Sequence, residues 1–246
     1  MNSKITLAFA ALLFASCASM PQPEALTTEA WSDKGEGTST YGFSSGWAFY
    51  GAEIQAAGTG GVLEGETGTD NTDLAPRYGG AFKASHFFTD DFSLGLVAEL
   101  RSFEADPISP LSATLTAEPF ETYHFLISSR YWLEPRGEEN RLRPFIGCDL
   151  GYIPGVNFGS VDVTYPDPIP GEKVNIKADG YFNIAPVVGA SYLWNDHMSV
   201  DMGAFYEFPI TAGETELTFP ALGGSTSRVE VAPEGLIFFF GLSFYM

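Results

Sequence analysis

Charged and polar side chains recur at every second position in several segments of the chain, so that they would share one face of a β-strand. Five acids, four bases and one histidine follow this rule. They are Glu53, Lys83, Glu99, Arg101, His124, Arg130, Arg143, Asp149, Asp201 and Glu207. The set is almost neutral, although the whole chain has a formal charge of −19. Since unpaired charge is costly to bury, this near balance predicts an interior in which the groups pair.

Catalysis by this set would need a nucleophile within hydrogen-bonding distance of His124. Ser128, on the same predicted face, lies four residues further along the chain, which is about 13 Å in a strand. The two side chains therefore cannot pair directly, and the sequence predicts no catalytic site. We expect His124 to be a hydrogen-bonded member of the interior set. A serine from a neighbouring strand is the alternative, and it would make the protein an enzyme.

Other kinds of site lack their sequence signatures. The chain has no phosphate-binding loop, dinucleotide fingerprint or zinc-ligand spacing, so no cofactor is expected. Glu64, Glu66, Asp70 and Asp73 gather between 58 and 76 without the regular spacing of a calcium loop, which predicts no dedicated metal site. The chain has 31 acidic residues against 12 lysines and arginines. Nucleic acid is therefore excluded as a partner, because phosphate binding needs a basic surface.

The elements that must position the polar set are strands, because β-branched and aromatic residues alternate with polar ones from about residue 40 onward. The eight predicted strands are 44–57, 77–88, 91–104, 119–133, 143–156, 180–194, 197–208 and 235–246. Short or moderate connections alternate with long ones, and the long ones are 58–76, 105–118, 157–179 and 209–234. Tight turns at one rim and long loops at the other are typical of an outer-membrane barrel.

The second face of the predicted strands is apolar. In the strand at 91–104, Glu99 and Arg101 share one face, and the other face consists of Phe92, Leu94, Leu96, Ala98 and Leu100. A nearly neutral polar face inside and an apolar face against lipid predict an all-β fold, an eight-stranded antiparallel up-and-down transmembrane β-barrel. Eight strands enclose a space that side chains just fill, so we expect a closed lumen rather than a wide pore.

Aromatic residues gather near both ends of the predicted strands, where membrane barrels carry interfacial girdles. The ring at the tight-turn rim is predicted to contain Phe87, Phe88, Tyr131, Trp132, Tyr192, Trp194, Phe244 and Tyr245. The ring at the loop rim is predicted to contain Tyr78, Phe103, Phe120, Tyr152, Tyr181 and Phe208. Both rings are expected to flank the lipid-facing apolar band.

Residues 1–18 have the pattern of a secretory signal peptide, with a basic start, an apolar run and small residues before the cleavage site. Two cleavage sites fit the sequence. One follows Ala18, and the other precedes Cys17, where the preceding residues resemble a lipobox and cleavage would leave Cys17 lipidated. Residues 19–43 are rich in Pro, Thr, Glu and Gly, which predicts a flexible periplasmic linker. Residues 44–246 form the predicted barrel domain.

With these features the chain resembles the small outer-membrane β-barrel superfamily, the OmpA- and OmpX-like eight-stranded barrels. Gly241, Phe244 and Met246 are similar to the C-terminal signal read by the barrel-assembly machinery, although the usual last residue is aromatic and Met246 departs from it. The resemblance implies a monomer in the bacterial outer membrane. The implied partners are the assembly machinery and membrane lipid. The acids between 58 and 76 add a further hypothesis, loose binding of divalent cations that bridge to lipopolysaccharide.

The function implied by this resemblance is structural or one of surface interaction, with the long acidic loops as contact elements. Two alternatives remain open. A narrow channel for ions or small solutes needs a lumen that conducts, which the paired interior set should prevent. A lipid-modifying barrel enzyme needs His124 to act as a base.

Overall fold

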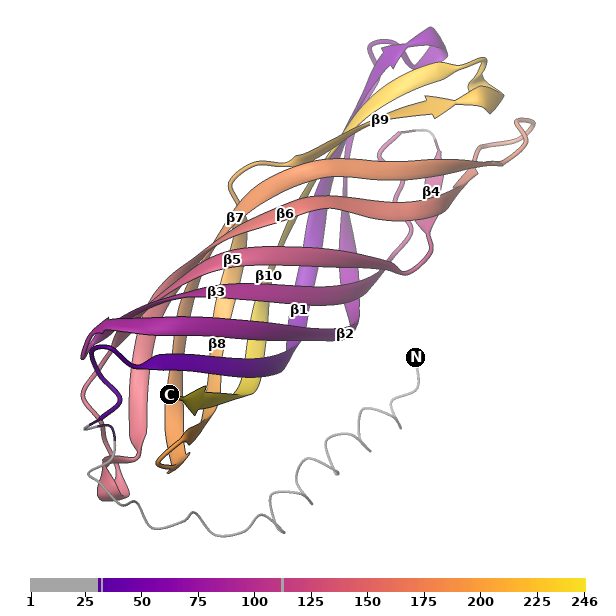
Figure 1. Ribbon diagram of the computed structural model, residues 1–246. Helices are drawn as coiled ribbons and strands as arrows, with labels where there is room; N and C mark the ends of the chain where they lie inside the picture. The colour runs from indigo at the N-terminus through magenta and orange to yellow at the C-terminus, as the bar shows by residue number, and fades with distance from the viewer. Residues whose placement is uncertain (1–30, 32, 112) are drawn as a thin grey trace, which may run out of the picture.

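The computed structural model describes residues 31, 33–111 and 113–246, which form a closed antiparallel β-barrel (Figure 1). Its strands are β1 (Ser39–Gly60), β2 (Thr67–Thr89), β3 (Phe92–Ala105), β4 (Thr114–Ala117), β5 (Phe120–Trp132), β6 (Leu142–Thr164), β7 (Glu172–Asn195), β8 (Met198–Pro209), β9 (Gly213–Phe219) and β10 (Ser225–Tyr245). Its short 3-10 helices are η1 (Gly61–Leu63), η2 (Glu138–Asn140) and η3 (Pro220–Leu222). Among the described residues, no helix has the length and hydropathy needed to cross a membrane.

Eight of the strands form the ring of the barrel. Each strand of the order β1-β2-β3-β5-β6-β7-β8-β10 pairs with the next, and β10 pairs back with β1. The short strands β4 and β9 lie off this ring, where β4 pairs with β6 and β9 with β10. The ring confirms the predicted eight-stranded antiparallel up-and-down barrel.

The barrel has two unlike rims. At one rim, β2 joins β3 through Asp90 and Asp91, and β7 joins β8 through Asp196 and His197. The start of β1 and the end of β10 lie at this same tight-turn rim (Figure 1). In outer-membrane barrels the short turns face the periplasm, so the resemblance implies that the opposite rim, hereafter the far rim, faces the cell exterior.

The strands are longer than a bilayer requires. β6 contains 23 residues, which at about 3.3 Å per residue and a tilt of about 40° rise roughly 57 Å, against an apolar band of about 25 Å. The prediction of long loops at 58–76, 157–179 and 209–234 is therefore wrong, because most of these residues continue the strands or form the hairpin of β9 with β10. The wall beyond the band is hereafter the projecting half of the barrel.

The two faces of the wall exchange their character between the band and the projecting half. Within the band, β5 turns Phe125 and Ile127 outward, where each is more than half exposed, and turns His124 inward. In the projecting half, β7 turns Lys177 outward and Ile176 inward. Lipid covers the outer surface of the band, whereas water covers the projecting half, whose apolar side chains therefore pack inside. In both parts successive residues face inward and outward in turn, but the apolar residues face outward in the band and inward in the projecting half.

The aromatic residues near the two ends of the band do not all face the lipid, so the girdle prediction is partly wrong. Tyr78, Tyr131 and Tyr152 are exposed on the outer face. Alternation sends other members of the predicted rings into the lumen. Those that face inward are Phe87, Trp132 and Tyr245 near the tight turns, and Phe103, Phe120 and Tyr181 at the outer edge of the band. These inward-facing aromatic side chains form two layers inside the barrel.

The chain before the predicted barrel is packed in part. β1 already begins at Ser39, and Trp31 and Lys34 are buried. This part of the predicted 19–43 linker is therefore folded against the barrel. The predicted signal peptide at 1–18 and the predicted lipidation site Cys17 lie outside the described residues.

Candidate functional site

Two layers of charged side chains fill the lumen within the band. The layer nearer the far rim, hereafter the upper layer, is centred on Arg101 and Glu207. Arg101 donates two hydrogen bonds of 2.7 Å to the carboxylate of Glu99 and one of 2.5 Å to Oε2 of Glu207. The Tyr50 hydroxyl donates to the same Glu207 oxygen at 2.5 Å. The Glu207 side chain has no exposed surface. Its burial is tolerable because Arg101 supplies a positive charge in direct contact.

His124 completes the upper layer from β5. Its Nδ1 lies 3.4 Å from Oε1 of Glu207, and its Nε2 lies 2.9 Å from the Thr122 hydroxyl. Ser128 is buried further down the same strand. Among the described residues, the polar partners of the His124 ring are thus a threonine and a glutamate. The structure places His124 within the polar layer.

The lower layer lies nearer the tight-turn rim. Arg130 and Asp149 form an ion pair in which Nη1 and Nη2 of the guanidinium each donate to one carboxylate oxygen, Nη2 at 2.9 Å. Asp201 accepts hydrogen bonds from hydroxyls on three strands, and these donors are Ser191, Ser199 and Ser243. The lower layer therefore joins β5 to β6 through the ion pair, and joins β7, β8 and β10 through the charge-assisted hydrogen bonds to Asp201.

Lys83 and Arg143 occupy different places. Lys83 projects from β2 at the level where that strand pairs with Gly42, and its ammonium lies near enough to Arg130, Asp149 and Asp201 of the lower layer to interact with their charges. Arg143 lies below the layers, at the tight-turn rim, and pairs with Asp91 at 3.0 Å. Its guanidinium also lies 5.8 Å from the ring centre of Trp132. Arg143 is therefore buried, but it belongs to the rim rather than to either layer.

Glu53 is a correction to the predicted interior set. It is exposed on the outer face of β1, where Gln55 donates a hydrogen bond of 2.6 Å to it. Glu53 shares the odd-numbered face of this strand with Phe43, Trp47 and Phe49, so its predicted inward position was an error of parity. The remaining acids of the set equal the remaining bases in number. The acids are Glu99, Asp149, Asp201 and Glu207, and the bases are Lys83, Arg101, Arg130 and Arg143.

The three residues of the predicted assembly signal lie at the end of β10. Phe244 and Met246 are exposed, on the lipid-facing side. Gly241 faces inward, and a Cβ atom there would lie 2.5 Å from the carbonyl oxygen of Phe43, so a larger residue would push β10 away from β1. Reading of these residues by the assembly machinery stays a prediction.

Above the upper polar layer the lumen becomes apolar and hollow. A cavity of about 80 Å³ begins there, and its floor includes Tyr50, Thr122, His124 and Tyr181. Its walls are formed almost entirely by aliphatic and aromatic side chains, among them Leu74, Phe103 and Ile176. The floor therefore marks the level at which the inside of the barrel changes from ionic to apolar.

A second cavity of about 300 Å³ lies between the first and the far rim. Leu115, Leu217 and Val229 line both cavities, so the two are neighbours. Together they are hereafter the chamber. Its outer end is reached at Val62 and Pro110, which line only the second cavity. An apolar cavity of about 150 Å³ is enough to hold benzene, so the chamber is large enough for a small hydrocarbon.

A polar tie holds the outer end of the chamber together. The Tyr165 hydroxyl donates a hydrogen bond to Glu172, whose other carboxylate oxygen accepts one of 3.0 Å from the backbone N–H of Ala221. Burial in the first place, and then the hydrogen bond to Glu172, raise the pKa of Tyr165. The phenol therefore remains a donor at neutral and mildly alkaline pH, and it keeps the β6–β7 connection joined to η3.

Sequence reasoning missed the chamber because its walls lie in segments that were interpreted as loops. The signal was present in the sequence. Val161 and Val163, and after the turn Val174 and Ile176, alternate with polar residues at the same period as in the band. Tyr50, Thr122 and Tyr181 were missed as members of the floor because uncharged side chains do not reveal on which side of a barrel they lie.

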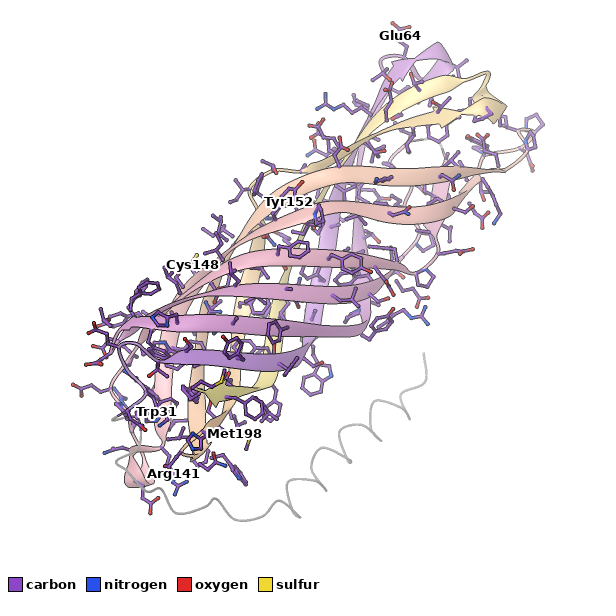
Figure 2. All side chains as sticks on the ribbon, viewed as in Figure 1. Trp31, Glu64, Arg141, Cys148, Tyr152 and Met198 are labelled. Carbon is purple, nitrogen blue, oxygen red and sulfur yellow. The ribbon has the colours of Figure 1, made fainter. Side chains whose placement is uncertain are left out.

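The acids between 58 and 76 do not assemble into a metal centre. Within the part of the chain that the structure describes, no three His, Cys, Asp or Glu side chains come close enough together to hold a metal ion. Figure 2 shows Glu64 at the tip of the far rim, remote from Arg141 and Trp31 at the opposite end.

No protein-family model and no curated protein matches the chain, but solved structures share its fold. It is 15% identical to the outer membrane protein OprG from Pseudomonas aeruginosa, with 86% of this chain and 97% of that chain covered and a TM-score of 0.60. It is 13% identical to the outer membrane protein AlkL, determined in lipid bilayers, with 92% and 97% covered and a TM-score of 0.56. At these identities the likeness shows the fold, which is that of the small outer-membrane β-barrels, as the resemblance predicted.

Proposed function

We propose that this outer-membrane β-barrel admits small apolar molecules from the cell exterior into its chamber, as the first step of their transport into the outer membrane or across it. One observation carries the proposal: the projecting half is hollow and apolar inside, directly above two layers of paired charge. Capture from water is favourable because each Å² of apolar surface removed from water contributes roughly 25 cal/mol. A ligand that buries about 200 Å² would thus gain roughly 5 kcal/mol before the entropic cost of binding.

Methyl NMR in lipid nanodiscs tests the proposal at the level of single residues. The probe is perdeuterated toluene, added to protein with labelled Ile, Leu and Val methyl groups. We expect concentration-dependent shifts for Leu115, Leu217 and Val229, which line both cavities. Leu96 and Val188 face outward and report toluene dissolved in the lipid. If only these outward methyl groups respond, the chamber does not bind toluene and the proposed function fails.

A matched variant separates binding in the chamber from a general effect of the solvent. Leu217→Trp adds volume at the boundary between the two cavities, so we expect the toluene shifts of Leu115 to disappear. Leu96→Trp places the same residue on the lipid face and should leave them unchanged. An equal loss in both variants would show that the shifts do not depend on the chamber.

The two ionic layers predict that the lumen does not conduct. The buried pair of Arg101 with Glu207 reaches across the interior from β3 to β8, and the buried pair of Arg130 with Asp149 joins the neighbouring strands β5 and β6 below it. The aromatic residues near the tight turns fill the space below both pairs. We expect planar bilayers that contain the protein to show the current of the bare bilayer, with a wide porin as the positive control. Stable current steps would instead favour the alternative of a narrow ion or small-solute channel.

The outer face of the projecting half supports a second, surface-interaction role. It carries exposed acids on several strands, among them Asp73, Glu104, Asp162, Glu214 and Glu216. Such a surface suits divalent cations that bridge to lipopolysaccharide, or a basic partner. Most of these acids come from the segments predicted as long loops, which the structure folds as strands. This role, the monomeric state and the contact with the assembly machinery stay predictions.

A further inference from the structure

An aromatic cluster fills the lumen at the tight-turn rim, and one of its members does not belong to the barrel wall. The cluster contains Trp31, Phe87, Trp132, Phe145, Val187, Leu193 and Tyr245. Six of these residues lie on β2, β5, β6, β7 and β10. Trp31 comes from the segment before β1, yet it is only 5% exposed. It is therefore the member of the cluster that can leave without breaking a strand of the ring.

Trp31 makes directional contacts with the rim. Its indole Nε1 donates a hydrogen bond of 3.0 Å to the carbonyl oxygen of Arg141. Its ring meets the Tyr245 ring edge-on, with the centroids 5.6 Å apart. The guanidinium of Arg143 lies 5.9 Å from the indole centre, a cation–π geometry. Figure 2 shows Trp31 and Arg141 together at the tight-turn end of the barrel.

The residues between Trp31 and β1 are fastened across the β2–β3 turn. The backbone N–H of Gly37 donates to the Phe87 carbonyl at 2.9 Å, and the Phe87 N–H donates back to the Thr38 carbonyl at 2.8 Å. The Glu36 N–H donates to the Asp90 carboxylate at 3.1 Å. Gly35 packs so closely on Asp90 that a Cβ atom would overlap the carboxylate. These contacts give the segment one fixed path over the mouth of the barrel.

We propose that residues 31 and 33–38 are a strap that closes the periplasmic mouth of the lumen, with Trp31 as its stopper. The strap separates periplasmic water from the Arg130–Asp149 layer above it. It makes the lumen a compartment closed at the bottom by a detachable segment and open only toward the chamber. This role goes beyond the proposed function and does not depend on it.

Trypsin tests whether the strap is docked. Lys34 is 4% exposed, so the full chain in nanodiscs should resist cleavage after this residue. Trp31→Ala should make that cleavage at least about tenfold faster, because local opening then costs less. Trp47→Ala removes an exposed tryptophan of the outer face and should leave the rate unchanged. Heat-modifiable migration on SDS gels verifies that each variant has formed its barrel. Equal cleavage rates in all three proteins would overturn the proposal.

A thiol probe tests whether the docked strap closes the mouth. Leu193, 1% exposed in the same cluster, is replaced by cysteine in a Cys17→Ser, Cys148→Ser background. A charged, membrane-impermeant methanethiosulfonate should react slowly, and Trp31→Ala should accelerate the reaction at least about tenfold. Trp31→Phe retains a ring and should remain nearly as slow as the parent. If Trp31→Ala accelerates trypsin cleavage but not thiol labelling, the strap docks without closing the mouth, and the proposal is wrong.

Discussion

Arg101→Ala is expected to lower the free energy of unfolding by about 3–5 kcal/mol, because it leaves the Glu207 carboxylate buried without a counter-charge. The Glu207 side chain has no exposed surface, and Arg101 contacts it at 2.5 Å while also holding Glu99 through two hydrogen bonds. Removal of the guanidinium therefore leaves two carboxylates without their main partner. Urea unfolding in lipid vesicles, followed by tryptophan fluorescence, measures the change.

Two further variants decide whether the loss comes from uncompensated charge. Arg101→Met with Glu207→Leu removes both charges and retains volume, so it should be clearly more stable than Arg101→Ala alone. Arg228→Ala breaks a pair of the outer face, in which Arg228 contacts Glu214 at 2.5 Å with about half of each side chain exposed. Water screens that pair, so little change is expected. An Arg101→Ala protein as stable as Arg228→Ala would show that the upper layer does not stabilise the barrel.

Ile176→Asp is expected to destabilise the protein by about 3 kcal/mol or more, because it puts a charge with no partner into the apolar chamber. Ile176 is 9% exposed and packs in the cluster of the projecting half. Its neighbour Lys177 lies on the water-covered face. Lys177→Asp introduces the same residue one position further along β7 and should have little effect. The same urea measurement compares the two variants.

This adjacent pair tests the exchange of faces directly. An assignment in which the apolar face points outward along the whole strand predicts the reverse order, with Lys177→Asp the more damaging change. Equal and small effects would indicate that the projecting half is not packed in solution. The toluene experiment with Ile176→Asp then gives a second reading, because a charged wall should also abolish binding in the chamber.

The closed barrel could be predicted because period-two alternation and the sequence of short and long connections are local properties of the chain. The residues of β3 and β5 fall on their predicted faces for this reason. Alternation defines two faces, however, and does not say which of them is inside. In the band the near neutrality of the polar face decided the question. Beyond residue 157 the same alternation belongs to a wall surrounded by water. Without knowing where the membrane ends, the sequence could not show which of the two faces points into the barrel.

Two other features, the position of Glu53 and the burial of Trp31, were missed for different reasons. Glu53 could have been placed correctly from its own strand, because it shares parity with Phe43 and Trp47. The burial of Trp31 could not have been foreseen, since its partners Arg141 and Tyr245 lie more than a hundred residues away in the sequence. A segment rich in Gly, Glu and Thr has the composition of a linker whether or not a single tryptophan anchors it.

The exchange of faces along each strand also fixes how deeply the protein sits in its membrane. A barrel with the same outward pattern along its whole length could slide along the bilayer normal at little cost. Here outward movement would draw Phe125 and Ile127 into water, and inward movement would drag Lys177 and its neighbours into hydrocarbon. The level at which the faces exchange therefore marks where the outer surface of the bilayer lies on the barrel. It sets the immersion depth without help from any lipid headgroup, and it keeps the mouth of the chamber clear of the bilayer.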